Sequence, residues 1–273
     1  MKAVKALVLT GNGVNCEREM AHACRLGGAE ADIVHLAEVF AGRVLLEDYH
    51  FLNFPGGFSD GDDLGSAKAG AVRLKYGRIR GDGPRRFLED LLRFVAAGKL
   101  VLGVCNGFQL LVKLGLLPGL DGRYVEQTAS LTHNDSGRFE DRWVHLRVET
   151  SGPCVFTCGI ERLYIPVRHG EGKFVPGDHE VLRRVERGGL VTLRYADAEG
   201  QPTQRYPDNP NGSVGAVAGL CDPTGRIFGL MPHPEAFLHR TNHPRWTRED
   251  LPDEGQGVAL FRNAVEFLRR EVV

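Results

Sequence analysis

The sequence predicts an α/β protein whose central sheet is mostly parallel. Over residues 1–115, short apolar runs alternate with segments of helical periodicity, and glycine-rich turns follow several of these runs. After about residue 120 the pattern becomes richer in β-strands. Strand–helix–strand units of this length imply a sheet covered on both faces, with functional loops at the carboxyl ends of the strands. We interpret residues 1–273 as a single domain with loop insertions around 60–86 and 200–215.

Each element of the first half is predicted from its own pattern. The apolar runs that predict strands are 6–9, 33–36, 51–54 and 100–104. After the first strand, Asn15 is the expected N-cap of a helix that stops at Leu26, before two glycines. Helical spacing between the last two strands is shown by Phe87, Leu88, Leu91, Leu92 and Val95.

The second half predicts further strands and a closing helix. The strand-like segments are 143–148, 190–195 and 227–230. The closing helix follows from the spacing of Phe261, Val265, Leu268 and Val272. We expect loops at 60–86 and 207–215. From residue 68 to 86, Lys and Arg side chains face a single acid, Asp82. A solvated face is the simpler interpretation of this basic strip, and a partner surface or phosphate contact is the alternative.

Composition excludes several classes of function. Because 34 basic side chains nearly balance 35 acidic ones, giving a net charge of -1, no global field would recruit nucleic acid or an anionic membrane. No apolar run reaches the ~18 residues of a membrane span or resembles a signal peptide, so we expect a cytoplasmic protein. Glycine contributes 35 of 273 residues, roughly twice the ~7% of ordinary proteins, which indicates many tight turns or close backbone approaches.

The six cysteines are not arranged as a disulfide framework. They include no CxxC pair, which argues against structural disulfides and a zinc knuckle. We expect packing residues at Cys16, Cys24 and Cys221 and structural thiols at Cys154 and Cys158. The remaining cysteine requires a separate explanation.

That cysteine, Cys105, carries the strongest chemical signal. It lies between Gly103 and Gly107, after an apolar strand and before an apolar helix, which is the nucleophile-elbow pattern with Cys in place of Ser. Both glycines are needed because the turn is tight. The helix N-terminus favours a thiolate, and Gln109 lies on the same helix face. A small buried cysteine would be the simpler explanation, but it accounts for neither glycine.

Two further motifs supply what a nucleophile needs. Gly56 and Gly57 follow another strand in a Pro-Gly-Gly turn, where a bare backbone N–H could point at a substrate carbonyl, and the Asn106 N–H would be a second donor to an oxyanion. Near the C-terminus, His233 is flanked by prolines and Glu235 follows two residues later. In an extended segment these two side chains would project to one side, so Glu235 would orient the imidazole ring.

Together these motifs resemble the class I, or triad-type, glutamine amidotransferases. Within that class they are most similar to the glutaminase subunits of phosphoribosylformylglycinamidine synthases. The segments that carry this likeness are PGGFSDGDDLGSAKAG, GVCNGFQLL, NDSGRFEDRWV, the HGEG turn at 169–172, NPNGS and MPHPE. The resemblance covers nearly the whole chain and implies a flavodoxin-like, three-layer fold. It also implies hydrolysis of L-glutamine to glutamate and ammonia.

The resemblance also implies a role for individual residues. The nucleophile would be Cys105, His233 and Glu235 would complete the triad, and Gly57 and Asn106 would supply the oxyanion hole. The residues expected to bind glutamine are Gln109, Asn134, Ser136 and Phe139. The residues expected at a partner interface are Arg78, Arg80, His169 and Glu171.

As partners, the resemblance implies a separate synthetase subunit and a small bridging subunit. The synthetase would use ATP and Mg²⁺ to convert formylglycinamide ribonucleotide to formylglycinamidine ribonucleotide in purine biosynthesis, and the present chain would need no cofactor or metal. Nucleic acid and membrane are not expected partners. The main alternative is a class I glutaminase that serves a GMP, carbamoyl phosphate or imidazole glycerol phosphate synthetase, without HGEG or NPNGS.

Nucleotide binding and metal binding are remote interpretations of this sequence. A dinucleotide-binding turn at 10–13 would need glycine where the chain has Cys16. Two sets of possible metal ligands are better interpreted as loop residues: Asp60, Asp62 and Asp63, and His233, His239 and His243.

Overall fold

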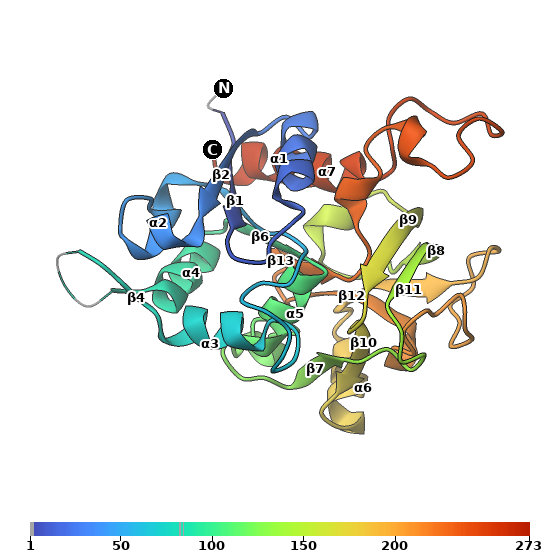
Figure 1. Cartoon of the computed structure of the whole chain (residues 1–273), viewed down its shortest axis with the longest axis horizontal. Helices are drawn as coiled ribbons and strands as arrows, with labels where there is room; N and C mark the ends of the chain where they lie inside the picture. The colour runs from blue at the N-terminus through green and yellow to red at the C-terminus, as the bar shows by residue number, and fades with distance from the viewer. Residues whose placement is uncertain (1–2, 82, 84) are drawn as a thin grey trace.

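The computed structural model describes residues 3–81, 83 and 85–273 and is built around a nine-stranded sheet (Figure 1). The strand order is β2-β1-β3-β6-β13-β12-β11-β8-β9. The parallel part consists of β2 (Glu30–His35), β1 (Lys5–Thr10), β3 (Phe51–Phe54), β6 (Leu100–Val104) and β13 (Ile227–Leu230). The antiparallel part adds β12 (Val217–Cys221), β11 (Val191–Ala196), β8 (Glu140–Val148) and β9 (Arg162–His169).

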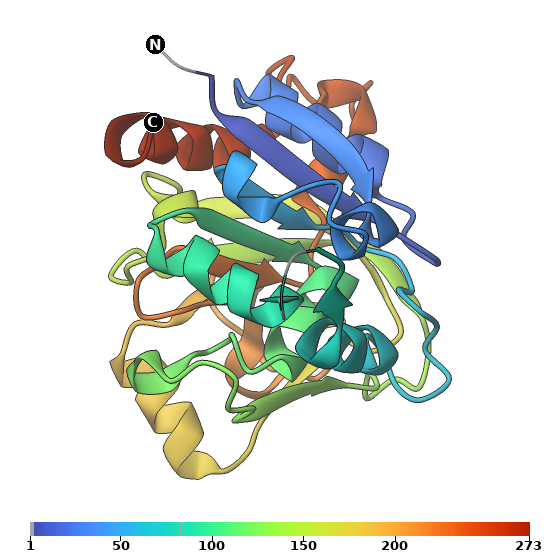
Figure 2. The ribbon, with the colours of Figure 1, turned by 90° about the vertical axis from the view of Figure 1, so that its left-hand side faces the viewer.

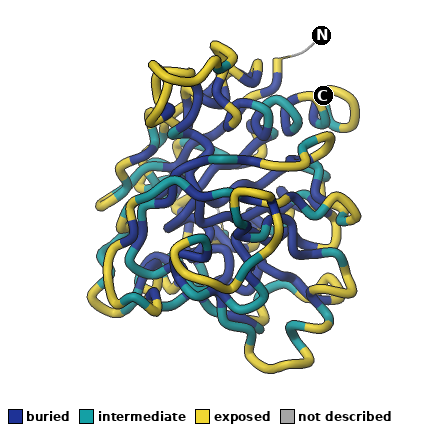
Figure 3. Tube along the Cα trace, turned by 90° about the vertical axis from the view of Figure 1, so that its right-hand side faces the viewer, coloured by how far each residue is buried: buried dark blue, intermediate teal, exposed yellow. Residues whose placement is uncertain are grey.

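Helices cover both faces of the parallel strands, as predicted (Figure 2). On one face α1 (Glu17–Leu26) packs against α7 (Val258–Glu271). On the other, α3 (Lys68–Tyr76) packs against α4 (Phe87–Ala96) and α5 (Asn106–Lys113). The buried positions run through the centre of the molecule and the exposed ones concentrate in peripheral loops (Figure 3). The fold is therefore the three-layer α/β arrangement expected from the sequence.

The remaining elements are short. Two small antiparallel pairs are formed by β7 (Ala129–Thr132) with β10 (Lys173–Pro176), and by β4 (Arg78–Ile79) with β5 (Arg85–Arg86). The remaining α-helices are α2 (Leu36–Phe40) and α6 (His179–Arg187). Single 3-10 turns are η1 (Leu46–Asp48), η2 (Leu120–Gly122), η3 (Val155–Thr157), η4 (Val214–Ala216), η5 (Pro234–Ala236) and η6 (Arg240–Asn242). No helix in the described part of the chain combines the length and apolarity needed to cross a membrane.

Most predicted elements are confirmed, and the deviations have local causes. The strand predicted at 33–36 ends at His35, because the His35 side chain accepts a hydrogen bond from the Ala37 N–H at 3.1 Å and caps α2. Helix α1 begins at Glu17 with Cys16, not Asn15, as its N-cap. Asn15 is instead held in the preceding turn, where its N–H donates to the Gly56 carbonyl at 3.3 Å.

The region 60–86 was expected to be a loop insertion, and this was wrong. It contains α3 and the short β4–β5 pair, while the expected acid of the basic strip, Asp82, lies outside the described residues. The helix packs against α5 through buried residues that include Gly70, Ala71 and Leu74. Segment 207–215 is irregular, but its polar residues Asn209, Asn211 and Ser213 are buried.

The turn from β6 into α5 is packed backbone against backbone. A Cβ on Gly103 would lie 2.6 Å from the Gly107 carbonyl oxygen, and one on Gly107 would lie 2.0 Å from the Phe54 carbonyl oxygen of β3. Both distances are far below van der Waals contact, so residue 103 and residue 107 must be glycine for α5 to lie against the sheet. The sequence-based reason for these two glycines is confirmed.

We expect Gly107→Ala to destabilise the protein by about 1–3 kcal/mol or more, because the added methyl group overlaps a strand carbonyl that cannot move aside. Urea unfolding measures this. The matched control is Gly11→Ala, which meets no heavy atom within 4 Å at a backbone φ that is not positive, and it should stay within about 0.5 kcal/mol of the parent protein. Equal unfolding midpoints for the two variants would contradict the packing argument.

Candidate active site

Cys105 lies at the β6–α5 turn in a strained backbone conformation. Its φ of 52° and ψ of -106° fall in a region that residues with a side chain rarely adopt. The conformation is held from both sides, since its N–H donates to the Leu230 carbonyl at 2.8 Å and its carbonyl accepts from the Gln109 N–H at 3.0 Å. The nucleophile elbow predicted from the sequence is therefore formed.

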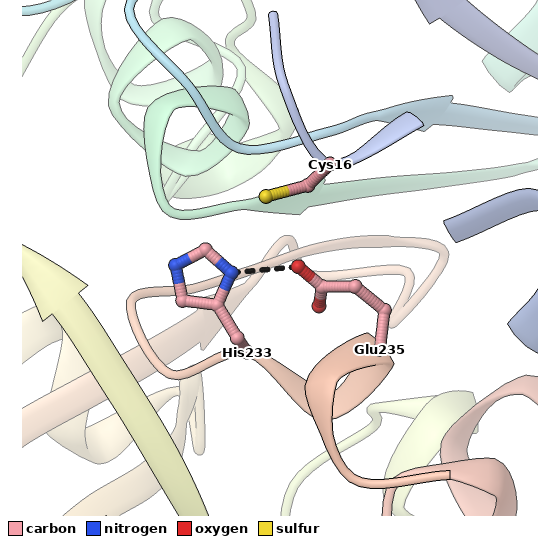
Figure 4. A group of neighbouring side chains, drawn as sticks. All are labelled: Cys16, His233 and Glu235. Carbon is pink, nitrogen blue, oxygen red and sulfur yellow. Dashed lines mark hydrogen bonds and ion pairs between the residues drawn. The ribbon is translucent and has the colours of Figure 1, made fainter. Parts of the chain in front are cut away.

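His233 and Glu235 form a buried hydrogen-bonded pair beside this turn. The Nδ1 of His233 lies 2.6 Å from the Oε1 of Glu235, and both residues are nearly inaccessible to solvent (Figure 4). The His233 N–H donates to the Pro166 carbonyl of β9 at 2.8 Å, which fixes the loop after β13. The remaining ring nitrogen, Nε2, has no hydrogen-bond partner among the described residues.

The pair forms by a different local geometry from the one predicted. The extended segment expected from His233 to Glu235 is wrong, because Pro234–Ala236 form the 3-10 turn η5. Pro234 is at the start of this turn, where its fixed φ is compatible with a helix and its missing N–H costs nothing. The turn carries the Glu235 carboxylate back beside the imidazole ring.

The surroundings of His233 favour its charged form. Burial by itself would lower the pKa of His233, but the Glu235 carboxylate and the nearby sulfur atoms of Cys105 and Cys16 together raise that pKa well above 6.5. The arrangement thus places an imidazolium, oriented by a carboxylate, beside the sulfur of Cys105.

Two backbone amides stand next to Cys105. Asn106 is the first residue of α5, so its N–H is one of the helix N–H groups without an intrahelical acceptor. Gly57 is paired with Val14 in an isolated antiparallel bridge whose hydrogen bonds come from the neighbouring Asn15 and Phe58 amides. The bridge therefore holds Gly57 without using its N–H. A φ of 137° and a Cβ that would lie 2.4 Å from the Gly13 carbonyl require glycine here.

The turn at 10–13 supports the loop that carries Gly57. The Phe58 N–H donates to the Gly13 carbonyl at 2.7 Å, and the Asp60 N–H donates to the Asn12 carbonyl at 2.9 Å. Gly13 approaches so closely that a Cβ would lie 2.1 Å from the Phe58 carbonyl oxygen. The close backbone approach that Gly13 permits is thus made to the loop that carries Gly57.

A cavity of about 660 Å³ opens over Cys105 and His233. Of the residues expected around glutamine, Gln109 lines its wall and Phe139, which is 54% exposed, lies at its mouth. Other lining residues were missed because nothing in their local sequence marks them: Asn15, Cys16, Glu19, Asp62, Ser66, His133, Arg138 and Arg168. They come from separate segments that only the fold brings together.

Asn134 and Ser136 were expected to line the glutamine pocket, but neither is among the residues that line the cavity. The Asn134 amide donates to the His169 carbonyl at 2.8 Å and to the Arg138 carbonyl at 2.9 Å, and it accepts from the Gly172 N–H at 3.0 Å. Its polar atoms are thus used to join two turns of the chain. The Ser136 hydroxyl accepts from the Arg138 N–H at 3.3 Å.

The HGEG turn was expected at a partner interface, and the structure turns its two polar side chains toward the cavity. His169 is only 3% exposed, and both it and Glu171 line the cavity. The turn is drawn inward because the Glu171 carbonyl accepts from the Gln109 side chain and the Glu171 carboxylate accepts from the Ser66 N–H at 3.2 Å. Arg78 and Arg80, by contrast, are exposed as expected.

Cys16 is not the simple packing residue that we expected. It lines the cavity, and its thiol donates to the Asn15 side-chain oxygen at 3.1 Å. In the part of the chain that the structure describes, the Cys16 sulfur, a ring nitrogen of His233 and a carboxylate oxygen of Glu235 all lie within 4.8 Å of one another (Figure 4). Cys24, Cys154 and Cys221 are buried, and Cys158 is exposed.

The two sets weighed as metal ligands have other contacts. Asp60 forms an ion pair with Arg73 at 3.1 Å, and Asp62 accepts from the Ser66 hydroxyl at 3.2 Å. His239 caps the 3-10 turn η6, and His243 packs edge-on against the Trp143 ring. Four of the six residues therefore have contacts of their own within the chain.

Comparison with known proteins places these features in a family. Residues 3–268 match the model of the CobB/CobQ-like glutamine amidotransferase domain. The phosphoribosylformylglycinamidine synthase subunit PurQ of Dehalococcoides mccartyi is 44% identical over 274 residues, covering 99% of this chain and 100% of that protein. The same subunit of Methanococcus maripaludis strain S2 is 41% identical over 279 residues, covering 97% and 98%.

Solved structures agree with this placement. A chain of PurLQS from Thermotoga maritima aligns with a TM-score of 0.71 and 29% identity, over 98% of this chain and 100% of that one. A putative GMP synthase subunit from Thermoplasma acidophilum, 14% identical with a TM-score of 0.54, covers 99% and 96% and shows the shared fold alone. The chain therefore belongs to the CobB/CobQ-like glutamine amidotransferases and, within them, to the PurQ subunits of phosphoribosylformylglycinamidine synthase.

Proposed function

We propose that this chain hydrolyses L-glutamine through Cys105, His233 and Glu235 and delivers the ammonia to the synthetase subunit of phosphoribosylformylglycinamidine synthase. The observation that carries this proposal is that a strained Cys elbow and His233 line one cavity, with the His233 ring joined to Glu235 at 2.6 Å behind it. A separate ammonia-using subunit is supported by the PurQ relatives, which are named as subunits of that synthase.

In the first half-reaction the Cys105 thiolate attacks the side-chain amide carbon of glutamine. The carbonyl oxygen becomes an oxyanion that accepts hydrogen bonds from the Gly57 and Asn106 amides, one such donor being worth about 3–4 kcal/mol of barrier. The Nε2 of His233 then gives its proton to the amide nitrogen, the C–N bond breaks, and ammonia leaves. A γ-glutamyl thioester remains on Cys105.

The second half-reaction releases glutamate and restores the site. Water gives a proton to the Nε2 of His233 as its oxygen attacks the thioester carbon, and the same two amides stabilise the second oxyanion. The C–S bond breaks, which frees glutamate and returns Cys105 to the thiolate. Glu235 keeps the imidazole in one orientation throughout because it holds Nδ1.

The cavity suits a zwitterionic amino acid. Glu19 and Asp62 bring negative charge to its wall, while Arg138 and Arg168 bring positive charge. Side chains of both signs can pair with the α-amino and α-carboxylate groups of glutamine while Gln109 lines the wall near Cys105. L-Glutamine is the substrate proposed on this basis.

The proposed partners are the synthetase subunit and a small bridging subunit. Arg78 and Arg80 are exposed next to α3, whose own surface exposes Val72 and Tyr76 at 54% and 63%. A surface that combines exposed apolar and basic side chains is suited to a protein partner with acidic groups. In this proposal ATP and Mg²⁺ are bound by the synthetase, and this chain contributes ammonia alone.

Cys105→Ser should lower the rate of glutamine hydrolysis at least about 10³-fold, because the serine hydroxyl stays un-ionised and is a much weaker nucleophile than a cysteine thiolate. The measurement is ammonia release from glutamine by the complex with the synthetase. Cys158→Ser, which changes an exposed cysteine elsewhere, is the control and should leave the rate unchanged. A glutamine-analogue diazoketone should label Cys105, and labelling at another residue or undiminished activity in Cys105→Ser would refute the assignment.

Glu235→Gln should lower kcat/KM about 10²–10⁴-fold and move the alkaline limb of its pH profile to lower pH. The raised pKa of His233 keeps the imidazolium present above pH 6.5, and the imidazolium is lost as the pH rises through that raised pKa. Without the carboxylate, burial dominates and the pKa of His233 falls. Glu180→Gln on α6, an exposed position, is the control. An alkaline limb that does not move would contradict this role of Glu235.

Reversing two charges, with Arg78→Glu and Arg80→Glu together, should weaken the complex with the synthetase at least about tenfold at low ionic strength. Analytical ultracentrifugation, or surface plasmon resonance with the synthetase immobilised, measures the dissociation constant. Arg183→Glu with Arg187→Glu makes the same charge change on α6 at exposed positions and serves as the control. If both pairs of substitutions leave the complex equally stable, the interface lies elsewhere.

A further inference from the structure

Cys16 brings a second sulfur to the cavity wall, and the proposed reaction does not use it. It is the N-cap of α1 and lines the same cavity as Cys105 and His233. Its sulfur, a ring nitrogen of His233 and a carboxylate oxygen of Glu235 lie within 4.8 Å of one another. The Cys105 sulfur is not a member of this group. Three different types of metal ligand therefore meet beside the nucleophile without including it.

The spacing of these three groups is close to that of a zinc site. The ring nitrogen that faces Glu235 is Nδ1 of His233, which lies 2.6 Å from Oε1. Figure 4 shows the Cys16 sulfur pointing toward the bond between these two atoms. Ligand atoms around a tetrahedral Zn²⁺ stand about 3.3–3.6 Å apart, because its bonds are about 2.0–2.3 Å long. The pair would need to open by less than about 1 Å to admit the ion.

Gly56 leaves space beside the same groups. A Cβ on Gly56 would lie 3.4 Å from the Cys16 sulfur and 2.8 Å from Cε1 of His233, the ring carbon that is bonded to Nδ1. The sulfur and that edge of the imidazole ring thus lie around one point, at which residue 56 has no side chain. Because Cys16 and His233 both line the cavity, an ion would reach them from the cavity.

The chemistry of the three ligands suits zinc and not magnesium. A thiolate, a neutral imidazole and a carboxylate are ligands that Zn²⁺ prefers, whereas Mg²⁺ requires oxygen ligands in octahedral geometry. The position of Cys16 at the N-terminus of α1 favours the thiolate. The charges of the thiolate and the carboxylate together neutralise a divalent ion, which lowers the cost of burying it. The second carboxylate oxygen of Glu235 is buried without a hydrogen-bond partner among the described residues, so this carboxylate has bonding capacity to spare.

We propose that Cys16, His233 and Glu235 bind a zinc ion that inhibits the glutaminase, with the fourth position of the ion open to the cavity. This inference rests on the proposed glutaminase function. Binding forms bonds from zinc to the Cys16 sulfur, to Nδ1 of His233 and to the Glu235 carboxylate. It releases two protons, one from the Cys16 thiol and one from Nδ1 of the imidazolium. His233 is left as a neutral ring whose hydrogen is on Nε2.

Bound zinc stops the proton transfers that His233 performs. The water that attacks the γ-glutamyl thioester must give a proton to Nε2, but a metal on Nδ1 keeps Nε2 protonated. Cys105 loses its proton acceptor for the same reason. Glutamine hydrolysis therefore stops. Amination by the synthetase from added ammonia does not need His233 and continues.

The first experiment titrates Zn²⁺ into the complex with the synthetase and follows the release of glutamate from glutamine. All chains carry Cys158→Ser, which removes an exposed thiol that would bind metal nonspecifically. Zinc should inhibit at a single ion per chain, a chelator should restore the rate, and Mg²⁺ should have no effect. Amination of formylglycinamide ribonucleotide from added ammonium chloride should continue at the same zinc concentration. Equal inhibition of both reactions would place the ion on the synthetase and overturn the inference.

Cys16→Ser separates this site from a simpler one made of Cys105 and His233. Each variant is compared with its own metal-free rate, so a change in that rate does not affect the result. Cys16→Ser should raise the zinc concentration for half inhibition at least about tenfold, because it removes the sulfur ligand. Cys24→Ala, which changes a buried cysteine of the same helix, is the matched control and should leave that concentration within about twofold of the parent value. Unchanged inhibition in Cys16→Ser would overturn the inference.

Cobalt binding identifies the sulfur ligand without any catalysis. Co²⁺ held by a thiolate in a tetrahedral site gives a sulfur-to-cobalt charge-transfer band in the near ultraviolet. The parent chain and Cys105→Ser should both show this band, and Cys16→Ser should lose it. A band lost in Cys105→Ser and kept in Cys16→Ser would overturn the inference. If the parent complex releases no glutamate from glutamine, the proposed function fails, whereas the cobalt spectrum still tests the metal site.

A last measurement uses the full-length chain with Cys158→Ser alone and so does not depend on how a site variant folds. The ¹¹³Cd chemical shift of bound cadmium reports how many sulfur atoms coordinate the ion. One sulfur is expected, together with nitrogen and oxygen ligands. A shift typical of two sulfur ligands would bring Cys105 into the site, and a shift typical of none would remove Cys16 from it. Either result would overturn the inference.

Discussion

The site depends on one constraint, the contact of backbone with backbone at the end of β6. Gly107 lies so close to the Phe54 carbonyl, and Gly103 to Gly107, that no side chain fits at either position. This contact seats α5 directly against β3 and β6 and holds Cys105 in a positive-φ conformation. The strain at Cys105 is offset by the packing of its neighbours, because the sheet below and the helix above cannot separate without losing buried apolar contacts.

Parallel strand pairing then gathers the remaining chemistry at one edge. The strands β3, β6 and β13 are adjacent, so the turns that follow them carry the Gly57 amide, Cys105 and His233 to the same place. The glycine-rich turn at 10–13 holds the turn that carries Gly57. The carbonyls of Gly13 and Asn12 accept hydrogen bonds from the Phe58 and Asp60 amides. Part of the glycine excess in the chain is explained by these close approaches, each of which excludes a Cβ.

Sequence reasoning predicted the features that are local and missed those that are tertiary. Cys105, with glycines two residues away on each side, is a pattern that one segment carries by itself, and so is the His233–Glu235 pair. The backbone geometry predicted for that pair was wrong: His233 is bonded to Pro166, a residue of a distant strand, and the chain then enters the 3-10 turn η5. The inward turn of HGEG could not be foreseen, since it is drawn in by Gln109 and Ser66. Cys16 enters the cavity for the same kind of reason.

The motifs HGEG and NPNGS are explained by one buried hydrogen-bond network. Asn209 accepts from the amides of Gly212 and Ser213, and Ser213 accepts from the Phe174 N–H and fixes the oxygen of Asn211. Such a network costs desolvation at every polar group, so a hydrophobic core of the same volume would be expected to be no less stable. Apolar contacts, however, do not orient hydrogen-bond donors and acceptors. In this network each amide and hydroxyl has a fixed donor and acceptor side, so the Asn211 nitrogen faces the Nε2 of His169, which must accept. The orientation of the Asn211 amide, fixed by Ser213, is therefore a property that this network supplies and that stability alone does not require.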